Sequence, residues 1–179
     1  MKNPLHTPRC LREVIAHPSD APDLLLDTLT DWPNRFYSLS CHCRSDLFTV
    51  AGELAQNELI HQKIITGPVM SRCNHCKRAV LLFDASQHGY DVELDHFSCQ
   101  RKAIFSKQSF LCPTCDNSVF ALIARFEYPA GLIAALETGQ STGYSSHLGR
   151  EHDLFTWFTL IGRCNHCGVI TTISSECCS

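Results

Sequence analysis

The sequence predicts a mainly β protein, a small α+β fold in which two copies of one β unit share a core and a short helix lies near the N-terminus. Three observations lead to this prediction. The pentapeptide Arg-Cys-Asn-His-Cys occurs twice, at 72–76 and at 163–167. Eight of the twelve cysteines form four close pairs. Apolar residues alternate with other residues after the third pair, with the period of two that a β-strand requires.

Residues 1–34 are interpreted as an N-terminal extension that contains the short helix. Either Ser19 or Asp20 is the expected cap, Pro22 lies in the first turn, and the leucines that follow would pack on the core. Prolines and charged residues interrupt the first 20 residues, where a signal peptide needs an unbroken apolar stretch. No apolar run approaches the roughly 20 residues that span a bilayer. We therefore expect a cytoplasmic protein without a membrane partner.

The cysteines are the unusual part of the composition. In a reducing compartment, clustered cysteines more often bind metal or carry out redox chemistry than form a disulfide framework. The eight paired cysteines are Cys41 and Cys43, Cys73 and Cys76, Cys112 and Cys115, and Cys164 and Cys167. The pattern assigns no role to the other four, which are Cys10, Cys99, Cys177 and Cys178.

The four pairs predict two metal sites. A Cys-x-x-Cys turn, or knuckle, holds two sulfurs on one side of a tight loop, and a second knuckle completes the tetrahedral shell of four thiolates that suits Zn²⁺. We therefore expect two structural Zn²⁺ ions. Pairing within each copy would join knuckle 41–43 to 73–76 and knuckle 112–115 to 164–167, and a crossed arrangement is the alternative. Structural zinc contributes on the order of 10 kcal/mol to folding, which would stabilise a chain with few long regular elements.

Alignment of the two halves supports a duplicated unit. A phenylalanine lies five residues after the second cysteine in each half, Phe48 in one and Phe120 in the other. Each half then has a second apolar stretch that leads into the repeated pentapeptide, and the spacing between the knuckles is 29 residues in one copy and 48 in the other. The units are predicted at 35–98 and 99–179, with the extra length inserted at about 128–152.

At this point the sequence resembles the zinc-ribbon class, in which two knuckles at the ends of β-hairpins share one zinc. The resemblance covers roughly 35–83 and 109–172 and rests on the knuckles and strands. Gly168 follows its knuckle as is common in the class, and Asp116 is tolerated there because Asp can adopt positive φ. Arg44, Lys77 and the short Cys41-x-Cys43 spacing depart from the usual form. The class implies a scaffold and no particular activity.

The sequence motifs that would indicate an enzyme are incomplete. Cys-Pro-Thr-Cys resembles a redox-active pair, but a strand and not a helix is predicted after Cys115. The segment 147–152 has three residues between His and Glu-His, whereas the inverted metalloprotease motif has two. A zinc deaminase would need His-x-Glu upstream of Pro-Cys-x-x-Cys, and Leu111 stands before Cys112. We therefore expect no catalysis, with a thiol redox enzyme or a metal hydrolase as the alternative.

A protein partner is the favoured functional prediction. Residues 79–94 are predicted as two short strands joined at His88-Gly89, and this hairpin gathers acidic side chains. An acidic face could steer association with a basic protein, as in an immunity protein or inhibitor that neutralises a bacterial toxin. Histidines within the knuckles are expected to face solvent. The candidate partner-binding residues are Asp84, Asp91, Glu93 and Asp95.

The alternative is a nucleic-acid-binding or transcription-associated zinc ribbon. Phosphate binding relies on Lys and Arg, yet the formal charge is −3, and eight thiolates with two Zn²⁺ ions would make it more negative. Aromatic residues interleaved with basic ones, which a stacking surface needs, are also missing. The basic residues available for this alternative are Arg72, Lys77, Arg78, Arg101, Lys102, Lys107 and Arg163.

Overall fold

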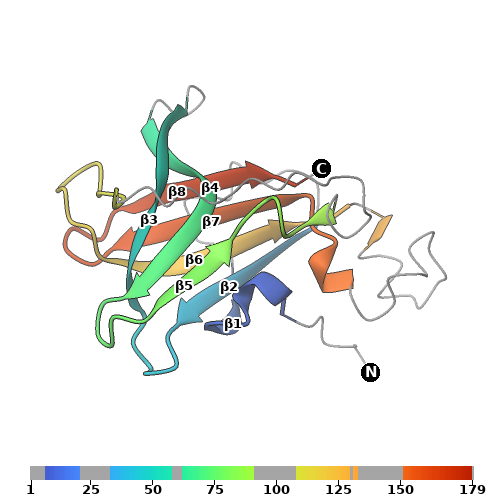
Figure 1. Cartoon of the computed structure of the whole chain (residues 1–179), viewed down its shortest axis with the longest axis horizontal. Coiled ribbons are helices and arrows are strands. Elements are labelled where there is room, and N and C mark those ends of the chain that lie inside the picture. The colour runs from blue at the N-terminus through green and yellow to red at the C-terminus, as the bar shows by residue number, and fades with distance from the viewer. Residues whose placement is uncertain are drawn as a thin grey trace.

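The computed structural model describes residues 7–20, 33–57, 62–90, 108–129, 131–132 and 151–178 (Figure 1). Strands dominate these ranges, which confirms the expected mainly β fold. The elements are η1 (Arg9–Leu11), β1 (Ile15–Ser19), β2 (Asn34–Ser40), β3 (Leu47–Asn57), β4 (Gln62–Cys73), β5 (Ala79–Phe83), β6 (Phe120–Glu127), η4 (Glu151–Asp153), β7 (Trp157–Cys164) and β8 (Ile170–Cys177). No helix within the described ranges has the length and apolar character needed to cross a membrane.

The N-terminal segment joins the sheet through β1. This strand pairs antiparallel with β2 from Ile15 opposite Ser40 to Ser19 opposite Phe36. Its five residues include an exposed proline, Pro18, as is usual for a short edge strand. The expected helix after Ser19 falls on residues 21–32, which lie outside the described residues.

Five of the described strands form a closed barrel, in the order β6-β3-β4-β8-β7 and back to β6. The β4–β8 contact closes it through one parallel pairing of Ile65 with Ser174. The strands β2 and β1 continue outward from β6, and β5 lies beside β4. In Figure 1 the ends of β4 and β7 that lead into the repeated pentapeptide lie toward the same side of the molecule.

The two halves pair their strands in the same register. In the first half Phe48 of β3 lies opposite Cys73 of β4. In the second half Phe120 of β6 lies opposite Cys164 of β7. The phenylalanine that follows the first knuckle is therefore the neighbour of the first cysteine of the second knuckle in both halves.

The third strand of each half, β5 in one and β8 in the other, also pairs in an equivalent register. Arg72 pairs with Ala79 in the first half, and Arg163 pairs with Ile170 in the second. A register shift interrupts β4–β5 between Val69 and Met70, three residues before Cys73. The equivalent shift interrupts β7–β8 between Leu160 and Ile161, three residues before Cys164.

A direct pairing of β3 with β6 joins the halves. Phe48 lies opposite Phe120, so Cys73, Phe48, Phe120 and Cys164 occupy successive strands in one line across the sheet. We call these four residues the cross-strand row. Because neighbouring strands lie about 4.8 Å apart, the row brings the Cα atoms of Cys73 and Cys164 to within about 15 Å.

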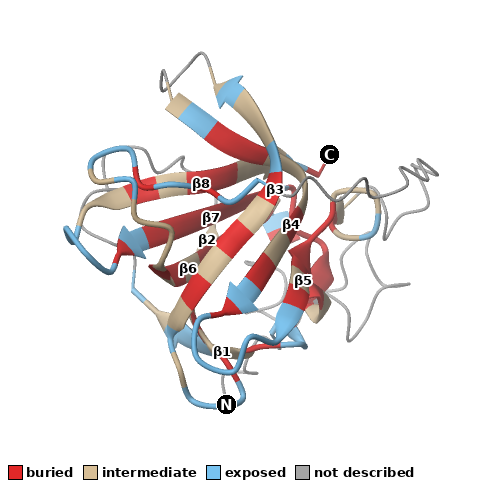
Figure 2. Cartoon of the chain, turned by 60° about the vertical axis from the view of Figure 1, so that its left-hand side comes forward, coloured by how far each residue is buried: buried red, intermediate tan, exposed pale blue. Residues whose placement is uncertain are grey.

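The alternation expected for β6 is present in the first half of the strand, whereas every residue from Ala124 to Glu127 is buried. Its inward-facing residues are at most 2% exposed, and the same alternation marks other strands in Figure 2. Aromatic rings fill the interior behind it: Phe83 of β5 stacks on Phe158 of β7 with ring centroids 4.2 Å apart, and Phe126 of β6 meets Phe155, which precedes β7, edge-on at 4.7 Å. The inward-facing residues are Phe120, Leu122, Ala124 and Phe126 of β6, and Tyr128 directly after the strand.

Gly162 lies where the core is packed too closely to admit a side chain without movement. A Cβ atom on Gly162 would lie 2.5 Å from Ile173 Cδ1 and 2.9 Å from Phe120 Cδ1. We expect Gly162→Ala to lower the free energy of unfolding by about 1–3 kcal/mol because the core must shift to admit the methyl group. Denaturant unfolding of the purified protein measures this change.

Ser71 provides the matched control because it occupies the equivalent position of the first half. It is 1% exposed, and its hydroxyl finds no hydrogen-bond partner among the described residues. Ser71→Ala should change the free energy of unfolding by less than about 1 kcal/mol, or raise it, because the hydroxyl is buried without compensation. Equal destabilisation by both variants would show that Gly162 is not specially constrained.

Candidate metal centres

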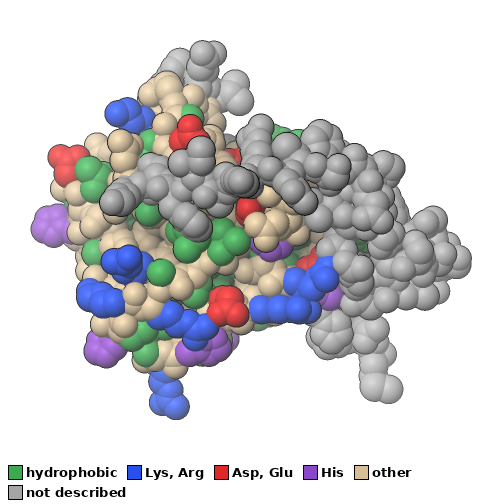
Figure 3. Space-filling view, viewed as in Figure 1, with side chains coloured by type: hydrophobic (Ala, Val, Ile, Leu, Met, Phe, Trp, Pro, Cys, Tyr) green, Lys and Arg blue, Asp and Glu red, His purple; other side chains and the backbone are tan. Residues whose placement is uncertain are grey.

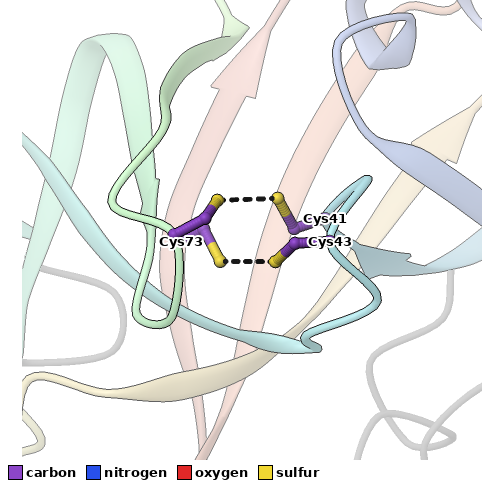
Figure 4. A group of neighbouring side chains, drawn as sticks. Cys41, Cys43 and Cys73 are labelled. Atoms are coloured by element: carbon purple, nitrogen blue, oxygen red, sulfur yellow. Dashed lines mark hydrogen bonds between the residues drawn. The ribbon is translucent and has the colours of Figure 1, made fainter.

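The first cysteine group brings together two turns that are distant in sequence (Figure 4). Cys41 and Cys43 lie in the turn after β2, Cys73 ends β4, and Cys76 lies in the turn before β5. Figure 4 shows sulfurs of the two turns facing one another. The Sγ atoms of Cys41 and Cys76 are 3.5 Å apart, as are those of Cys43 and Cys73. All four sulfurs lie within 4.8 Å of one another.

The second cysteine group repeats this arrangement. Cys112 Sγ lies 3.5 Å from Cys167 Sγ, and Cys115 Sγ lies 3.6 Å from Cys164 Sγ. In both groups the first cysteine of one knuckle faces the second cysteine of the other knuckle. The structure therefore groups the cysteines within each copy, as expected from the sequence, and the crossed alternative is wrong.

The sulfur geometry fits a metal ion. A tetrahedral site with metal–sulfur bonds of about 2.3 Å has edges of about 3.8 Å, close to the separations found here. A disulfide would need sulfurs about 2.05 Å apart, and the eight cysteines of the two groups are free thiols. Each group can therefore hold one tetrahedrally coordinated metal ion and leaves no coordination position open.

All four turns are closed by an equivalent backbone hydrogen bond, which spans four residues in three of them and three residues in the short Cys41-x-Cys43 turn. In each, the residue after the second cysteine donates its N–H to the carbonyl oxygen of the first cysteine, over 2.7–3.1 Å. This residue has positive φ, a conformation that costs a side-chain-bearing residue about 1 kcal/mol or more. The residues and φ angles are Arg44 at 69°, Lys77 at 63°, Asp116 at 56° and Gly168 at 74°.

Arg44 and Lys77 thus adopt positive φ, as Asp116 and Gly168 do. Of these residue types, only Gly and Asp let the sequence predict this conformation. The departure of Arg44 and Lys77 from the usual residue type does not change the shape of the first site. The short Cys41-x-Cys43 spacing also gives a closed turn, because the N–H of Arg44 reaches the carbonyl of Cys41 at 2.7 Å.

The backbone of the turns favours ionised sulfur at one equivalent position in each group. Burial acts to raise the pKa of Cys73, but hydrogen bonds from the backbone of Cys76 and His75 and from the Cys43 thiol outweigh it and lower this pKa to about 6. Burial likewise acts to raise the pKa of Cys164. Hydrogen bonds from the Cys167 backbone, the Asn117 amide and other neighbours outweigh it, and the pKa falls to about 5.

A neighbouring thiol in each group shows the opposite shift. A backbone hydrogen bond from Cys43 favours the Cys41 thiolate, but burial and the surrounding thiols prevail and raise the pKa of Cys41 to about 12. A hydrogen bond from the Asn117 backbone opposes burial and the neighbouring thiols at Cys115, and the pKa of Cys115 also rises to about 12. Four adjacent thiols cannot all ionise without a cation, so metal binding to each group must release protons.

The two groups differ in protection. Two cysteines of the first group are exposed, Cys43 and Cys76, whereas in the second group Cys167 is exposed and Cys115 is half-buried. The Asn117 side chain donates to Cys164 Sγ at 3.4 Å and to the carbonyl of Val119 at 2.9 Å. Ser45 occupies the position of Asn117 in the first group, and its hydroxyl accepts from the N–H of Leu47 instead.

The predicted acidic surface is placed only in part. Asp84 is 3% exposed, and its carboxylate accepts hydrogen bonds from the N–H and hydroxyl of Ser86 and from the Gln87 amide, at 2.7–2.9 Å. Asp84 therefore organises the turn after β5 and does not present its charge to solvent. The other three residues of the prediction, Asp91, Glu93 and Asp95, lie outside the described residues.

Compared with the acidic residues, more of the basic residues considered for the nucleic-acid alternative lie among the described residues. Those that are described are exposed and lie in or beside the knuckles, as are the knuckle histidines His42, His75 and His166. Arg44 belongs with them, although the sequence prediction omitted it; its place directly after Cys43 was the available signal. The described basic residues are Arg72, Lys77, Arg78 and Arg163, whereas Arg101, Lys102 and Lys107 lie outside the described residues.

Comparison with known proteins adds no relative. No family model matches the chain, and no curated protein or solved structure shows significant similarity to it. Inference about function therefore rests on the residues themselves.

We predict that a chelator removes metal from the two groups at different rates, the first group losing it sooner because one more of its cysteines is exposed and no side-chain amide donates to its sulfurs among the described residues. Asn117→Ala should speed the slower phase on the order of tenfold, the size of effect that partners of metal ligands commonly have. Release is followed with a chromophoric chelator. Ser45→Ala is the matched control and should alter neither phase; a single phase that Asn117→Ala leaves unchanged would contradict the prediction.

Proposed function

We propose that this chain is a non-catalytic structural-zinc protein, a binding module whose two zinc sites fix one end of its β scaffold. The observation that supports the proposal is the pair of closed four-cysteine groups. A catalytic zinc site keeps a coordination position for water or substrate, whereas a structural site is filled by four protein ligands. Four thiolates around each ion leave no such position.

Zinc is the metal that suits these groups best, on chemical grounds. A tetrahedral shell of four thiolates selects zinc or iron among common metals. Zinc has no redox chemistry and accepts whatever tetrahedral shell the turns provide, so it serves a purely structural role. The free thiols of the two cysteine groups fit a protein of the reducing cytoplasm.

The repeated register supports an interpretation as two duplicated zinc-ribbon-like units. The pairings of Phe48 with Cys73 and of Phe120 with Cys164 are equivalent, and so are the register shifts before each second knuckle. A shared set of pairings, including a shared irregularity, is expected when both halves descend from one unit. The units differ in the first knuckle, which has one residue fewer in the first copy.

The kind of partner is a separate question. An inhibitor of a basic protein, such as an immunity protein, remains a prediction that rests on Asp91, Glu93 and Asp95, because the carboxylate of Asp84 is buried. The exposed charge among the described knuckle residues is mostly basic. The geometry therefore supports a zinc-stabilised binding module and gives more weight to an anionic partner.

Elemental analysis tests the zinc proposal. Protein purified without added metal should contain about two zinc per chain, because four cysteines supply each ion. Iron in place of zinc would overturn the choice of metal. A metal content near zero, with every thiol open to titration, would overturn the structural-metal proposal itself.

A ligand variant links the metal to folding. Cys164→Ser should remove about one zinc per chain and strongly destabilise the second half, because loss of a ligand removes much of the folding free energy that the metal supplies. Cys177→Ser is the matched control, since Cys177 is also at the end of a strand but belongs to neither group. Equal zinc content and equal stability in the two variants would contradict the proposal.

A further inference from the structure

The turns of the first metal site carry a concentration of positive charge. Arg44 and Lys77 each follow the second cysteine of a knuckle, Arg72 precedes Cys73, and Arg78 follows Lys77. All four side chains are exposed, and we call them the first-site basic surface. Figure 3 shows Lys and Arg side chains on the lower part of the molecule, with histidines and one acidic side chain among them, toward the end where Figure 1 places the turns after β2 and β4.

The second metal site provides an internal comparison. At the four equivalent positions it has Asp116, Arg163, Gly168 and Val169, so it carries one positive and one negative charge where the first site carries four positive charges. Both sites would bind the same ion with the same four thiolates. The charge of a zinc–thiolate centre therefore does not require the basic residues of the first site.

Two residues of the first-site basic surface have an unfavourable backbone conformation. Arg44 and Lys77 hold positive φ, where glycine would avoid a cost of about 1 kcal/mol each. The second site has Gly168 at the position of Lys77. Long cationic side chains in strained positions of the first site indicate a role for the side chains themselves.

The cations have few acidic partners among the described residues. Arg78 forms an ion pair with Glu13, and the Lys77 ammonium donates to the carbonyl oxygen of Asn74. Neither Arg44 nor Arg72 forms an ion pair with a described residue. Most of the positive charge of this surface therefore faces solvent.

We propose that the first-site basic surface binds the phosphate backbone of a nucleic acid; this inference rests on the proposed structural-zinc scaffold, which holds the turns in place. Arg and Lys suffice for phosphate contacts, which position a nucleic acid without reading its sequence. A protein partner would need apolar or aromatic anchors at the centre of its interface. The large apolar side chains that are exposed among the described residues, Leu111 and Trp157, belong to neither knuckle of the first site.

The test uses a fluorescein-labelled 20-base-pair DNA duplex and measures anisotropy at several salt concentrations. Wild-type protein should bind with an affinity that falls steeply with salt. The double variant Arg44→Gly/Lys77→Gly should weaken binding on the order of tenfold at low salt and reduce the salt slope by about two, because two cations no longer neutralise a phosphate. Its fold should persist because glycine suits both turns.

Equivalent arginines in the repeated pentapeptide give the matched control. Arg72→Gln should weaken duplex binding and lower the salt slope by about one, whereas Arg163→Gln should change neither. Equal effects of the two variants would overturn the assignment of binding to the first site. No binding by wild-type protein, or binding to polyglutamate with the same salt slope as to DNA, would overturn the nucleic-acid proposal, the latter in favour of an acidic protein.

Zinc content, measured on the same samples, separates this inference from the structural-zinc proposal. Two zinc per chain without DNA binding would overturn the inference and leave the structural-zinc proposal standing. DNA binding that persists after both zinc ions are removed and the sheet has unfolded would show that the folded surface is not what binds.

Discussion

The structure depends on one electrostatic constraint, which is that four thiols held close together can all ionise only around a cation. Both cysteine groups place their sulfurs 3.5–3.6 Å apart in facing pairs, and in each group one thiol has a lowered pKa and another a raised one. A bound divalent metal would resolve this conflict and join turns that are far apart in the sequence. The metal would thereby order the strand ends that lead into these turns.

The cross-strand row connects both cysteine groups to one shared hydrophobic core. Cys73 and Cys164 end the row, and Phe48 and Phe120 lie between them on neighbouring strands, both at most 1% exposed. A metal ion bound to either group would therefore fix the end of a strand whose neighbour belongs to the shared interior. Such an arrangement lets the two halves of the chain bury one set of aromatic rings together.

The sequence predicts this architecture wherever the pattern is local. Cysteine spacing identified both groups, and the phenylalanine after each first knuckle marked the residue that pairs with Cys73 or Cys164. Features set by distant contacts were missed. The strand β1 is short and contains Pro18, and only its pairing with β2 makes it a strand. The burial of Asp84 was also missed, although its partners are local: Ser86 and Gln87 turn back onto its carboxylate, which composition alone does not indicate.

X-ray absorption at the zinc edge, on protein purified without added metal, tests the central claim most directly. Two closed tetrathiolate centres predict a single shell of four sulfur neighbours per zinc at about 2.3 Å, with no nitrogen or oxygen ligand. A shell that mixes sulfur with nitrogen or oxygen would mean that a histidine or a water molecule replaces a cysteine, and the sites would then not be closed structural centres.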